Sequence, residues 1–313
     1  MPTLKIMIGL PGSGKSSYAD KYMQNNNTVY LSSDFIRKDM FGFEDQTHNN
    51  QVFSRMNSET IFSLQTGFDV IYDATNLSAK RRIALINSVK RNVEDVYIDA
   101  YLMCVPINII LERNLTRTER HLPWEKLIQM ITYLEPPMYY EGFDNIYLIN
   151  GGMYDDIYGF TDMINKCKDY QQDNPYHNAT LGQHILTTVR RTEELSGNLL
   201  SKSDARILVE AAKYHDFGKI YCRTYNEKKN YYSYYGHENI STYMYLCHIR
   251  KNTLVDVFGR VKLTEARYKT AALILNHMQW YHREDMSVIK DRFKDNDLFN
   301  MLELLHWADK YRE

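Results

Sequence analysis

The stretch Gly9-Leu10-Pro11-Gly12-Ser13-Gly14-Lys15-Ser16 decides the fold of the first half of this chain. It matches the pattern G-x-x-x-x-G-K-[ST], follows an apolar run of strand length at Leu4–Ile8, and opens a helical pattern. Glycines in such a loop let backbone N–H groups point at phosphate oxygens beside the N-terminus of the following helix. We therefore expect this half to bind a nucleoside triphosphate; the alternative is a plain glycine-rich turn.

Each part of this phosphate loop has an expected role. Lys15 is placed to reach the β and γ phosphates, and the hydroxyl of Ser16 is placed to hold Mg²⁺. The other residues expected around the phosphates are Gly9, Gly12, Ser13 and Gly14. The expected cofactor is ATP or another NTP, with Mg²⁺.

Outward from the loop, the first half alternates short apolar runs with longer helical patterns, such as Ser78–Lys90 and Pro106–Arg117. The apolar runs have strand length and are rich in Val, Ile, Leu and Tyr. They are Leu4–Ile8, Thr28–Leu31, Phe68–Tyr72, Val96–Met103 and Ile146–Ile149. This alternation predicts an α/β domain in which a parallel sheet has helices on both faces.

The pattern changes after residue 150, where five stretches look helical by period and length and strand-like runs are scarce. The five stretches are Thr180–Asn198, Ser203–His215, Glu238–Arg250, Thr264–Gln279 and Asp297–Tyr311. We therefore predict a P-loop domain at residues 1–152, a linker at 153–172 and an all-α domain at 173–313.

Composition excludes some classes of function. The 313 residues carry 38 Lys and Arg against 39 Asp and Glu, a net charge of −1. This balance excludes a nucleic-acid coat or a polybasic membrane binder, though not a protein that engages one nucleic-acid end. No apolar run approaches the ~18 residues of a membrane span. Four scattered cysteines without a C-x-x-C pair indicate a reducing compartment, so we expect a cytoplasmic protein.

Polar residues follow the second and third predicted strands, at the sheet edge where such folds bind ligands. Asp34 and Arg37, three apart on a helical turn, face the same way. Asp34 could accept the proton of an attacking hydroxyl while Arg37 holds a phosphate of the acceptor. The alternative is a helix-capping Asp beside a surface Arg. Asp73 has a Walker-B-like position, where it orients Mg²⁺ through water, contacts the acceptor or caps a helix.

Three arginines follow the fourth predicted strand: Arg113, Arg117 and Arg120, with Pro123 behind them. Their spacings of four and three place them on one helix face. There they could close over the triphosphate and stabilise charge on the transferring phosphoryl group. The alternative is a solvated face paired with Glu112 and Glu119.

Four motifs of this half belong together. They are the phosphate loop, S-D-x-I-R at Ser33–Arg37, D-A-T-N at Asp73–Asn76 and R-N-x-x-R at Arg113–Arg117. They resemble the bacteriophage-type polynucleotide 5′-kinase family over about residues 1–150. The resemblance implies Lys15 and Ser16 at the NTP, Asp34 as general base for a 5′-hydroxyl, Arg37 near the acceptor's phosphate and Arg117 in a lid. Because small-molecule kinases share the loop, the acceptor's identity depends on Asp34 and Arg37.

Histidine is concentrated after residue 150, where eight of the ten lie. A series of potential metal ligands runs through the predicted helices: His184, His215, Asp216, His237, His277 and Asp309. Each can project inward from its own helix, as metal ligands do in helical bundles. Imidazole and carboxylate together suit Mn²⁺, Fe²⁺, Ni²⁺, Co²⁺ or Zn²⁺ better than Ca²⁺. Any single histidine of this kind is more often a core or surface residue, so the inference depends on the full series.

The order H…HD…H…H…D, with H-D-x-G-K at His215–Lys219 and G-H-E at Gly236–Glu238, resembles the HD phosphohydrolase superfamily over about residues 173–313. The resemblance implies a primary metal set of His184, His215, Asp216 and Asp309. It places His237 and His277 at a second metal or at the substrate phosphate, and makes Lys219 a candidate to hold that phosphate. His177 is either a substrate contact or a helix-entry residue.

The segment Tyr221–Tyr235 holds six tyrosines together with Arg223, Lys228 and Lys229. Interleaved aromatic and basic residues can stack bases and hold phosphates. The alternative is a tyrosine-rich surface loop. Because the segment lies between H-D and G-H-E, we expect it near the mouth of the metal site.

Together these features predict a bifunctional enzyme that heals nucleic-acid ends; they favour RNA over DNA without deciding between the two. One half would phosphorylate a 5′-hydroxyl end, and the other would remove a 2′,3′-cyclic phosphate or a terminal phosphomonoester. Expected partners are nucleic-acid ends and an RNA ligase, with no membrane. Two alternatives stay open: a small-molecule kinase fused to an HD nucleotidase, and an ATP-dependent regulator that senses a nucleotide or binds RNA.

Overall fold

The computed structural model describes residues 1–23, 25–42, 47–116, 121–150, 158–176, 178–197, 199–282 and 285–310. The chain forms two compact units, each built from separate stretches of sequence. Unit 1 comprises residues 1–122, 135–153 and 253–263, and unit 2 comprises 123–134, 154–252 and 264–313. Within the described ranges, no helix is long and apolar enough to cross a membrane.

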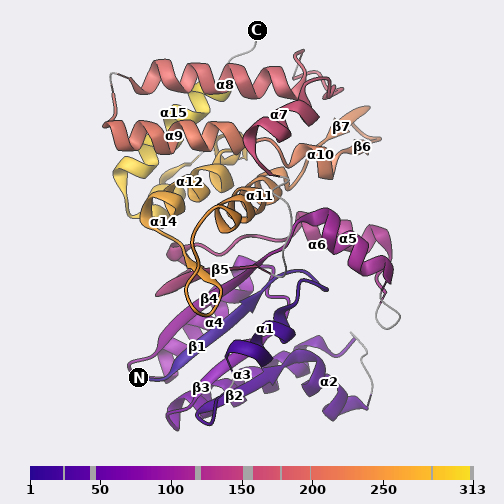
Figure 1. The fold of residues 1–313 in the computed structure, drawn as a ribbon, viewed down its shortest axis with the longest axis vertical. Helices are drawn as coiled ribbons and strands as arrows, with labels where there is room; N and C mark the ends of the chain where they lie inside the picture. Colours follow the sequence, from indigo (N-terminus) through magenta and orange to yellow (C-terminus); the bar gives the residue numbers. More distant parts are fainter. Residues whose placement is uncertain are drawn as a thin grey trace. The chain divides into compact units, whose positions relative to one another are not determined.

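Unit 1 contains a six-stranded sheet in the order β2-β3-β1-β4-β5-β8 (Figure 1). The strands are β1 Thr3–Ile8, β2 Thr28–Ser32, β3 Asp69–Asp73, β4 Tyr97–Cys104, β5 Asn145–Asn150 and β8 Arg260–Lys262. β1 to β5 pair in parallel, and β8 lies antiparallel to β5. All five strands predicted from the apolar runs are therefore confirmed, within one residue at each end, and the parallel α/β fold class is confirmed with them.

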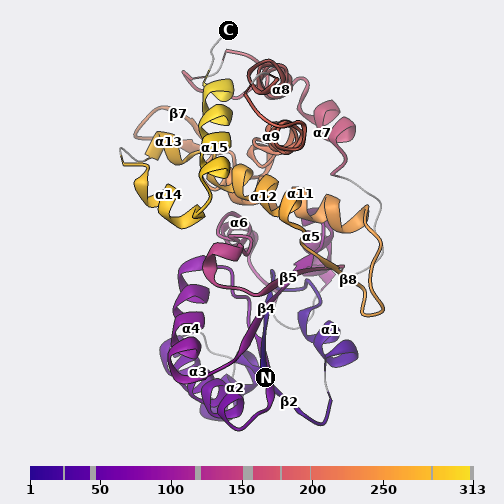
Figure 2. The same cartoon turned by 90° about the vertical axis from the view of Figure 1, so that its left-hand side faces the viewer.

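Helices cover both faces of this sheet. They are α1 Lys15–Tyr22, α2 Ser33–Phe41, α3 Asn49–Gln65, α4 Ala79–Asn92 and α5 Ile107–Thr116, with a short 3₁₀ helix, η1, at Tyr139–Glu141. Figure 2 shows α1 on the opposite face from α3 and α4. Alternation along the strands divides the core accordingly. Met7, Ile71 and Tyr101 pack with Tyr18 and Ala19 of α1.

Unit 2 is mostly helical, as predicted. Its helices are α6 Trp124–Thr132, α7 Phe160–Cys167, α8 Leu181–Ser196, α9 Lys202–Tyr214, α10 Lys219–Cys222, α11 His237–Lys251, α12 Glu265–Asn276, α13 Gln279–His282, α14 Ser287–Phe293 and α15 Asn296–Asp309. A hairpin of β6 Thr224–Asn226 and β7 Tyr231–Ser233 lies between α10 and α11. All five predicted helices form within three residues of their expected bounds. Buried Leu, Ile, Ala and Met side chains of α8, α9, α11, α12 and α15 make the core.

Two segments belong to a different unit from the segments that flank them in the sequence. The strand β8, between α11 and α12, completes the sheet of unit 1, and α6, which precedes β5, belongs to unit 2. The stretch expected as a linker contains α7, which packs on α8. The division into domains at 1–152 and 173–313 stays a prediction.

Candidate functional site

The phosphate loop joins β1 to α1 and has the geometry that its glycines allow. Gly12 and Gly14 have φ of +81° and +88°, the left-handed region that glycine adopts without strain. Gly14 is also the N-cap of α1, and because it carries no side chain it leaves the first N–H groups of the helix to a ligand. Lys15 Nζ donates to the carbonyls of Gly9, at 3.0 Å, and Leu10, at 3.1 Å, so the ammonium lies over the loop.

The structure brings Ser16 and Asp73 together at the end of β3. Ser16 Oγ donates to Asp73 Oδ2 at 2.7 Å, and the hydroxyl of Tyr30 donates to the same oxygen at 2.6 Å. Burial and the neighbouring Asp73 raise the pKa of Tyr30, so the phenol stays a neutral donor. Asp73 therefore accepts hydrogen bonds from side-chain hydroxyls and not from the end of a helix. One of the two donors is Ser16, the serine expected to hold Mg²⁺. Tyr30 was not identified from the sequence, because only the pairing of β2 with β3 places it there.

Asp34 and Arg37 form an ion pair on the first turns of α2, with 3.2 Å between Arg37 Nη1 and Asp34 Oδ1. The capping alternative does not hold, because Ser32 is the N-cap of this helix. Nor is the arginine a surface residue, since its side chain is only 2% exposed. The guanidinium also donates to the carbonyl of Ser33, at 3.2 Å, and to Asn49 Oδ1, at 2.7 Å. Arg37 is thus a buried side chain that holds the partly exposed Asp34 carboxylate in position.

Of the three arginines expected near the triphosphate, the structure places one. Arg113, in the last turn of α5, donates from Nη1 to the carbonyl of Gly12 at 3.0 Å and so contacts the phosphate loop. Arg117 and Arg120 lie outside the described residues, as does His177.

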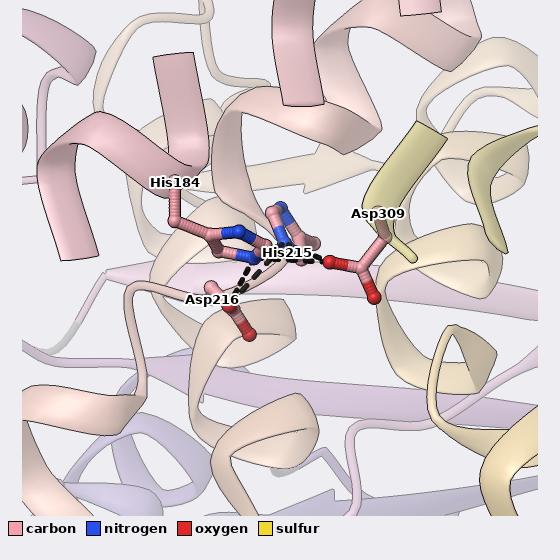
Figure 3. Close-up of side chains that lie close together, drawn as sticks. All are labelled: His184, His215, Asp216 and Asp309. Carbon is pink, nitrogen blue, oxygen red and sulfur yellow. Dashed lines mark hydrogen bonds and ion pairs between the residues drawn. The ribbon is translucent and has the colours of Figure 1, made fainter. Parts of the chain in front are cut away.

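The predicted metal ligands of unit 2 converge on one buried place from five helical elements. His184 lies within α8, His215 and Asp216 directly follow α9, His237 begins α11, His277 directly follows α12 and Asp309 ends α15. We call these six residues the His/Asp cluster. Figure 3 shows His184, His215, Asp216 and Asp309 with their side chains pointing at one another. Among the described residues, these four form one group suited to a metal ion, and Asp216, His237 and His277 form another.

The two groups share Asp216, whose two oxygens face different histidines. Its Oδ2 lies 3.1 Å from His184 Nε2 and 3.3 Å from His215 Nε2. Its Oδ1 lies 3.1 Å from His237 Nε2 and 3.6 Å from His277 Nε2. On the first side, Asp309 Oδ1 lies 3.0 Å from His184 Nε2 and 3.3 Å from His215 Nε2. The arrangement is that of a carboxylate bridging two adjacent sites.

Backbone carbonyls orient the imidazoles for metal binding. The Nδ1 atoms of His215, His237 and His277 each lie 2.7–2.8 Å from a carbonyl three residues earlier in the chain. A carbonyl only accepts, so Nδ1 carries a proton, and each ring presents an Nε2 lone pair when it is in its neutral form. His237 Nε2 and His277 Nε2 face each other at 3.1 Å. Two lone pairs repel at this distance, and a proton or a cation relieves the repulsion. This donor set fits a divalent transition-metal ion.

The pKa shifts of the cluster also indicate a site that attracts a cation. Burial alone would raise the pKa of Asp216, but Lys219 and His215 hold it well below its usual range. Asp309 is also held well below its usual pKa, because His184 and His215 outweigh its burial. Burial opposes the charged form of His215, yet the two carboxylates raise its pKa to about 10. Two ionised carboxylates in a buried place therefore attract positive charge, which here is carried by protons.

Lys219 and Gly218 complete the H-D-x-G-K motif. Lys219 Nζ donates to Asp216 Oδ2 at 2.6 Å and to Gln172 Oε1 at 3.0 Å, so the ammonium lies beside the cluster. Gly218 is needed for packing, because a Cβ there would lie 2.2 Å from the carbonyl oxygen of His237. Gln172, which orients Lys219, was not identified from the sequence.

A cavity of about 950 Å³ opens onto the cluster. Its walls include His184, Asp216, Lys219, His237 and Asp309. Residues 229 and 231–235 of the tyrosine-rich segment also line it, so this part of the segment lies near the His/Asp cluster, where the metal site was predicted. His282, which is not part of the predicted series of metal ligands, lines the same cavity. Tyr281, another lining residue, donates to Asp309 Oδ2 at 3.2 Å.

Comparison with protein families gives one match, in the first half. Residues 4–137 match the AAA domain model AAA_33. Together with the loop geometry described above, this match supports a nucleotide-binding P-loop domain in the first half of the chain. No curated protein matches the chain.

Comparison with solved structures gives distant likenesses. A chain of the Pnkp1/Rnl/Hen1 RNA repair complex is 24% identical with a TM-score of 0.37, over 42% of this chain and 44% of that chain. A sugar kinase from Janibacter sp. HTCC2649 is 14% identical with a TM-score of 0.34, over 49% of this chain and 87% of that chain. This chain thus spans less than half the length of the repair-complex chain. Neither likeness identifies the acceptor.

Proposed function

We propose that this chain is a bifunctional enzyme that heals broken RNA ends. Unit 1 would be a 5′-hydroxyl kinase that uses an NTP, and unit 2 a metal-dependent 2′,3′-cyclic phosphodiesterase or phosphatase of the HD type. The observation that carries the proposal is that one chain holds both a phosphate loop with an acceptor-side carboxylate and a carboxylate bridging two imidazole pairs. Strand cleavage that leaves 5′-hydroxyl and cyclic-phosphate ends creates both substrates at once.

In the kinase half, each residue has a role that its contacts support. Lys15 would exchange the carbonyls of Gly9 and Leu10 for the β and γ phosphates of the nucleotide. Ser16 and Asp73 would hold Mg²⁺, directly or through water. Asp34 would accept the proton of the attacking hydroxyl. Arg37 is turned towards Asp34 and Asn49, so we assign it first to positioning Asp34.

In the hydrolase half, His184, His215, Asp216 and Asp309 would hold a divalent ion such as Mn²⁺, Ni²⁺, Co²⁺, Fe²⁺ or Zn²⁺. Such an ion supplies a nucleophile at neutral pH by lowering the pKa of a bound water. His237 and His277 would hold a second ion or the substrate phosphate. Lys219 places a positive charge on the cavity wall, where it would bind the phosphoryl oxygens.

The products suggest a partner. A 5′-phosphate and a 3′-hydroxyl are the ends that a ligase joins, so we propose that the enzyme acts before an RNA ligase, in the cytoplasm.

Acceptor preference tests the kinase half. The protein is incubated with γ-³²P-ATP and either a 5′-hydroxyl oligoribonucleotide, the matching oligodeoxyribonucleotide or a nucleoside. We expect label on the oligoribonucleotide, lost in Lys15→Ala and Asp34→Asn. Asp39→Asn, on the same helix as Asp34 but paired with Arg55, is the matched control and should keep the activity. Label on the nucleoside alone would instead identify a small-molecule kinase.

Hydrolysis of a 2′,3′-cyclic-phosphate RNA tests the other half. The protein is treated with EDTA and then supplied with Mn²⁺. We expect hydrolysis only with the metal, and none in Asp216→Asn or Asp309→Asn. His248→Gln removes an imidazole of the same unit that lies outside the cluster, and this variant should stay active. Metal-independent hydrolysis would contradict the proposal for unit 2.

A further inference from the structure

We infer that the tyrosine-lined side of the unit 2 cavity binds the bases of single-stranded nucleic acid next to the phosphate that is hydrolysed. Unit 2 then prefers a polynucleotide end to a mononucleotide. We call Tyr176, Tyr231, Tyr232 and Tyr235 the aromatic wall. The inference rests on the proposed hydrolase function of this cavity and adds its substrate class.

The lining of the cavity is unusually rich in tyrosine. Six tyrosines contribute to it: Tyr176, Tyr231, Tyr232, Tyr234, Tyr235 and Tyr281. Two rings of the aromatic wall are largely in solvent, with Tyr176 51% and Tyr235 62% exposed. Large rings held partly in water around a polar cluster are suited to a ligand that has flat faces and polar edges. Nucleic-acid bases are such ligands, and stacking on aromatic rings accepts any base.

The aromatic wall is held in place before any ligand arrives. The rings of Tyr176 and Tyr231 meet edge to face with centroids 5.7 Å apart, and their hydroxyls are 3.0 Å apart. The guanidinium of Arg223 lies 3.8 Å from the centre of the Tyr232 ring and forms an ion pair with Asp173. A binding surface fixed in this way loses little conformational entropy when it binds.

Hydrogen bonds also tie the aromatic wall to the His/Asp cluster. Tyr234 lies in the sequence between the wall residues Tyr232 and Tyr235. Its hydroxyl donates a hydrogen bond to the carbonyl of Gln172 at 2.5 Å. The side chain of Gln172 accepts from Lys219, which in turn donates to Asp216. A chain of hydrogen bonds therefore joins the segment that carries the aromatic wall to the His/Asp cluster.

The charge and the size of the cavity suit a strand of nucleotides. Lys229 Nζ lies 3.2 Å from the hydroxyl of Tyr235 and within 6 Å of the centres of the Tyr231 and Tyr235 rings. A cation among the rings is placed to meet a backbone phosphate. The cavity volume of about 950 Å³ is at the upper end of the range for small-molecule sites, roughly 300–1,000 Å³.

Binding of a labelled RNA to the full chain tests the inference. The probe is an RNA hexamer with a 3′-phosphate and a 5′-fluorescein, which removes the hydroxyl that the kinase half would use. Fluorescence anisotropy gives its Kd, and a 3′-mononucleotide serves as competitor. We expect Tyr231→Ala and Tyr235→Ala each to weaken hexamer binding by about 5-fold to about 150-fold, the range for loss of one base–aromatic stack. Tyr235→Phe keeps the ring and should bind within about 3-fold of wild type.

Tyr133→Ala is the matched control, because Tyr133 belongs to the same unit and is 63% exposed but does not line the cavity. It should bind the hexamer as wild type does. Equal losses in Tyr133→Ala and in the wall variants would overturn the inference. A mononucleotide that competes as well as an unlabelled hexamer would also overturn it.

Hydrolysis of bis(p-nitrophenyl) phosphate, which has no base, separates this inference from the proposed function. If wild type with Mn²⁺ fails to hydrolyse it and fails on RNA, the proposed hydrolase is wrong, while the binding data still decide the inference. If the wall variants keep the base-free rate and lose the RNA rate, the inference is supported. Loss of both rates in parallel would contradict it.

Discussion

Binding of Mn²⁺ to the His/Asp cluster should stabilise unit 2, and the tryptophans make this measurable. The chain has three tryptophans, Trp124, Trp280 and Trp307, and all of them belong to unit 2. Intrinsic tryptophan fluorescence during heating therefore follows the unfolding of this unit. The comparison is between protein in EDTA and protein with excess Mn²⁺.

The expected size follows from ligand linkage. A cation that binds only the folded state adds about 2.7 kcal/mol to the free energy of unfolding when its concentration is 100 times its Kd. For a unit of this size, each kcal/mol shifts Tm by roughly 2–4 °C. The tryptophan-detected Tm should therefore rise by about 5–11 °C.

The stabilisation should grow as the pH rises. Burial opposes the charged form of His215, but Asp216 and Asp309 raise its pKa from 6.5 to about 10. Without metal, the raised pKa stabilises the fold fully below about pH 6.5, and this contribution is lost as the pH rises towards 10. A bound cation displaces the proton, so the metal-bound protein does not lose it. The difference should widen by up to about 1.4 kcal/mol per pH unit for each proton displaced.

Variants decide whether the cluster is responsible. Asp309→Asn keeps the shape of the side chain but removes the charge that faces His184 and His215. It should lose most of the Mn²⁺-induced shift, whereas His248→Gln should keep it. A shift that is unchanged in Asp309→Asn, or that shrinks between about pH 6.5 and about pH 8.5, would refute this reasoning.

Three further predictions concern unit 1 and the charge of the chain. Asp34→Asn should lower kcat of phosphoryl transfer by about 10²–10⁴-fold with little change in KM for ATP; steady-state kinetics that show an unchanged kcat would exclude Asp34 as general base. Arg82→Ala should destabilise unit 1 by about 3–5 kcal/mol, because Arg82 and Glu141 are each 1% exposed and joined by two bonds of 2.7 Å. Urea unfolding followed by circular dichroism measures this, with exposed Arg81→Ala as the control, and a loss below about 1 kcal/mol would be too small for a broken buried pair. The net charge of −1 predicts that log Kd for RNA rises with log salt as expected for about one to three phosphates, so a slope steeper than about +5 would indicate a basic groove.

The fold could be predicted where the signal lies in neighbouring residues. β1 to β5 are continuous apolar runs, and α8, α9 and α15 repeat buried positions at helical spacing. α3 escaped prediction because its sequence is mostly polar, although Val52, Met56 and Thr60 are buried at spacings of four. β8 could not be predicted, since Arg260–Lys262 is a strand only because it pairs with β5.

The candidate sites, like the fold, could be predicted only in part from the sequence. The membership of the His/Asp cluster could be predicted from the full series of imidazoles and carboxylates on separate predicted helices, although no single member would have indicated it. The opposite directions of the two Asp216 oxygens could not be, since they depend on helix packing. The contacts of Tyr30 with Asp73 and of Asn49 with Arg37 were missed for the same reason. Each joins residues that no local pattern relates.

The most direct test of the account follows both ends of one RNA. An oligoribonucleotide with a 5′-hydroxyl and a 2′,3′-cyclic phosphate is incubated with the protein, ATP, Mg²⁺ and Mn²⁺, and the state of each end is resolved by mass spectrometry. The account predicts that wild type converts both ends, Lys15→Ala only the 3′ end and Asp216→Asn only the 5′ end. The account would be contradicted if wild type never converted both ends of the RNA. It would also be contradicted if either folded variant lost both activities.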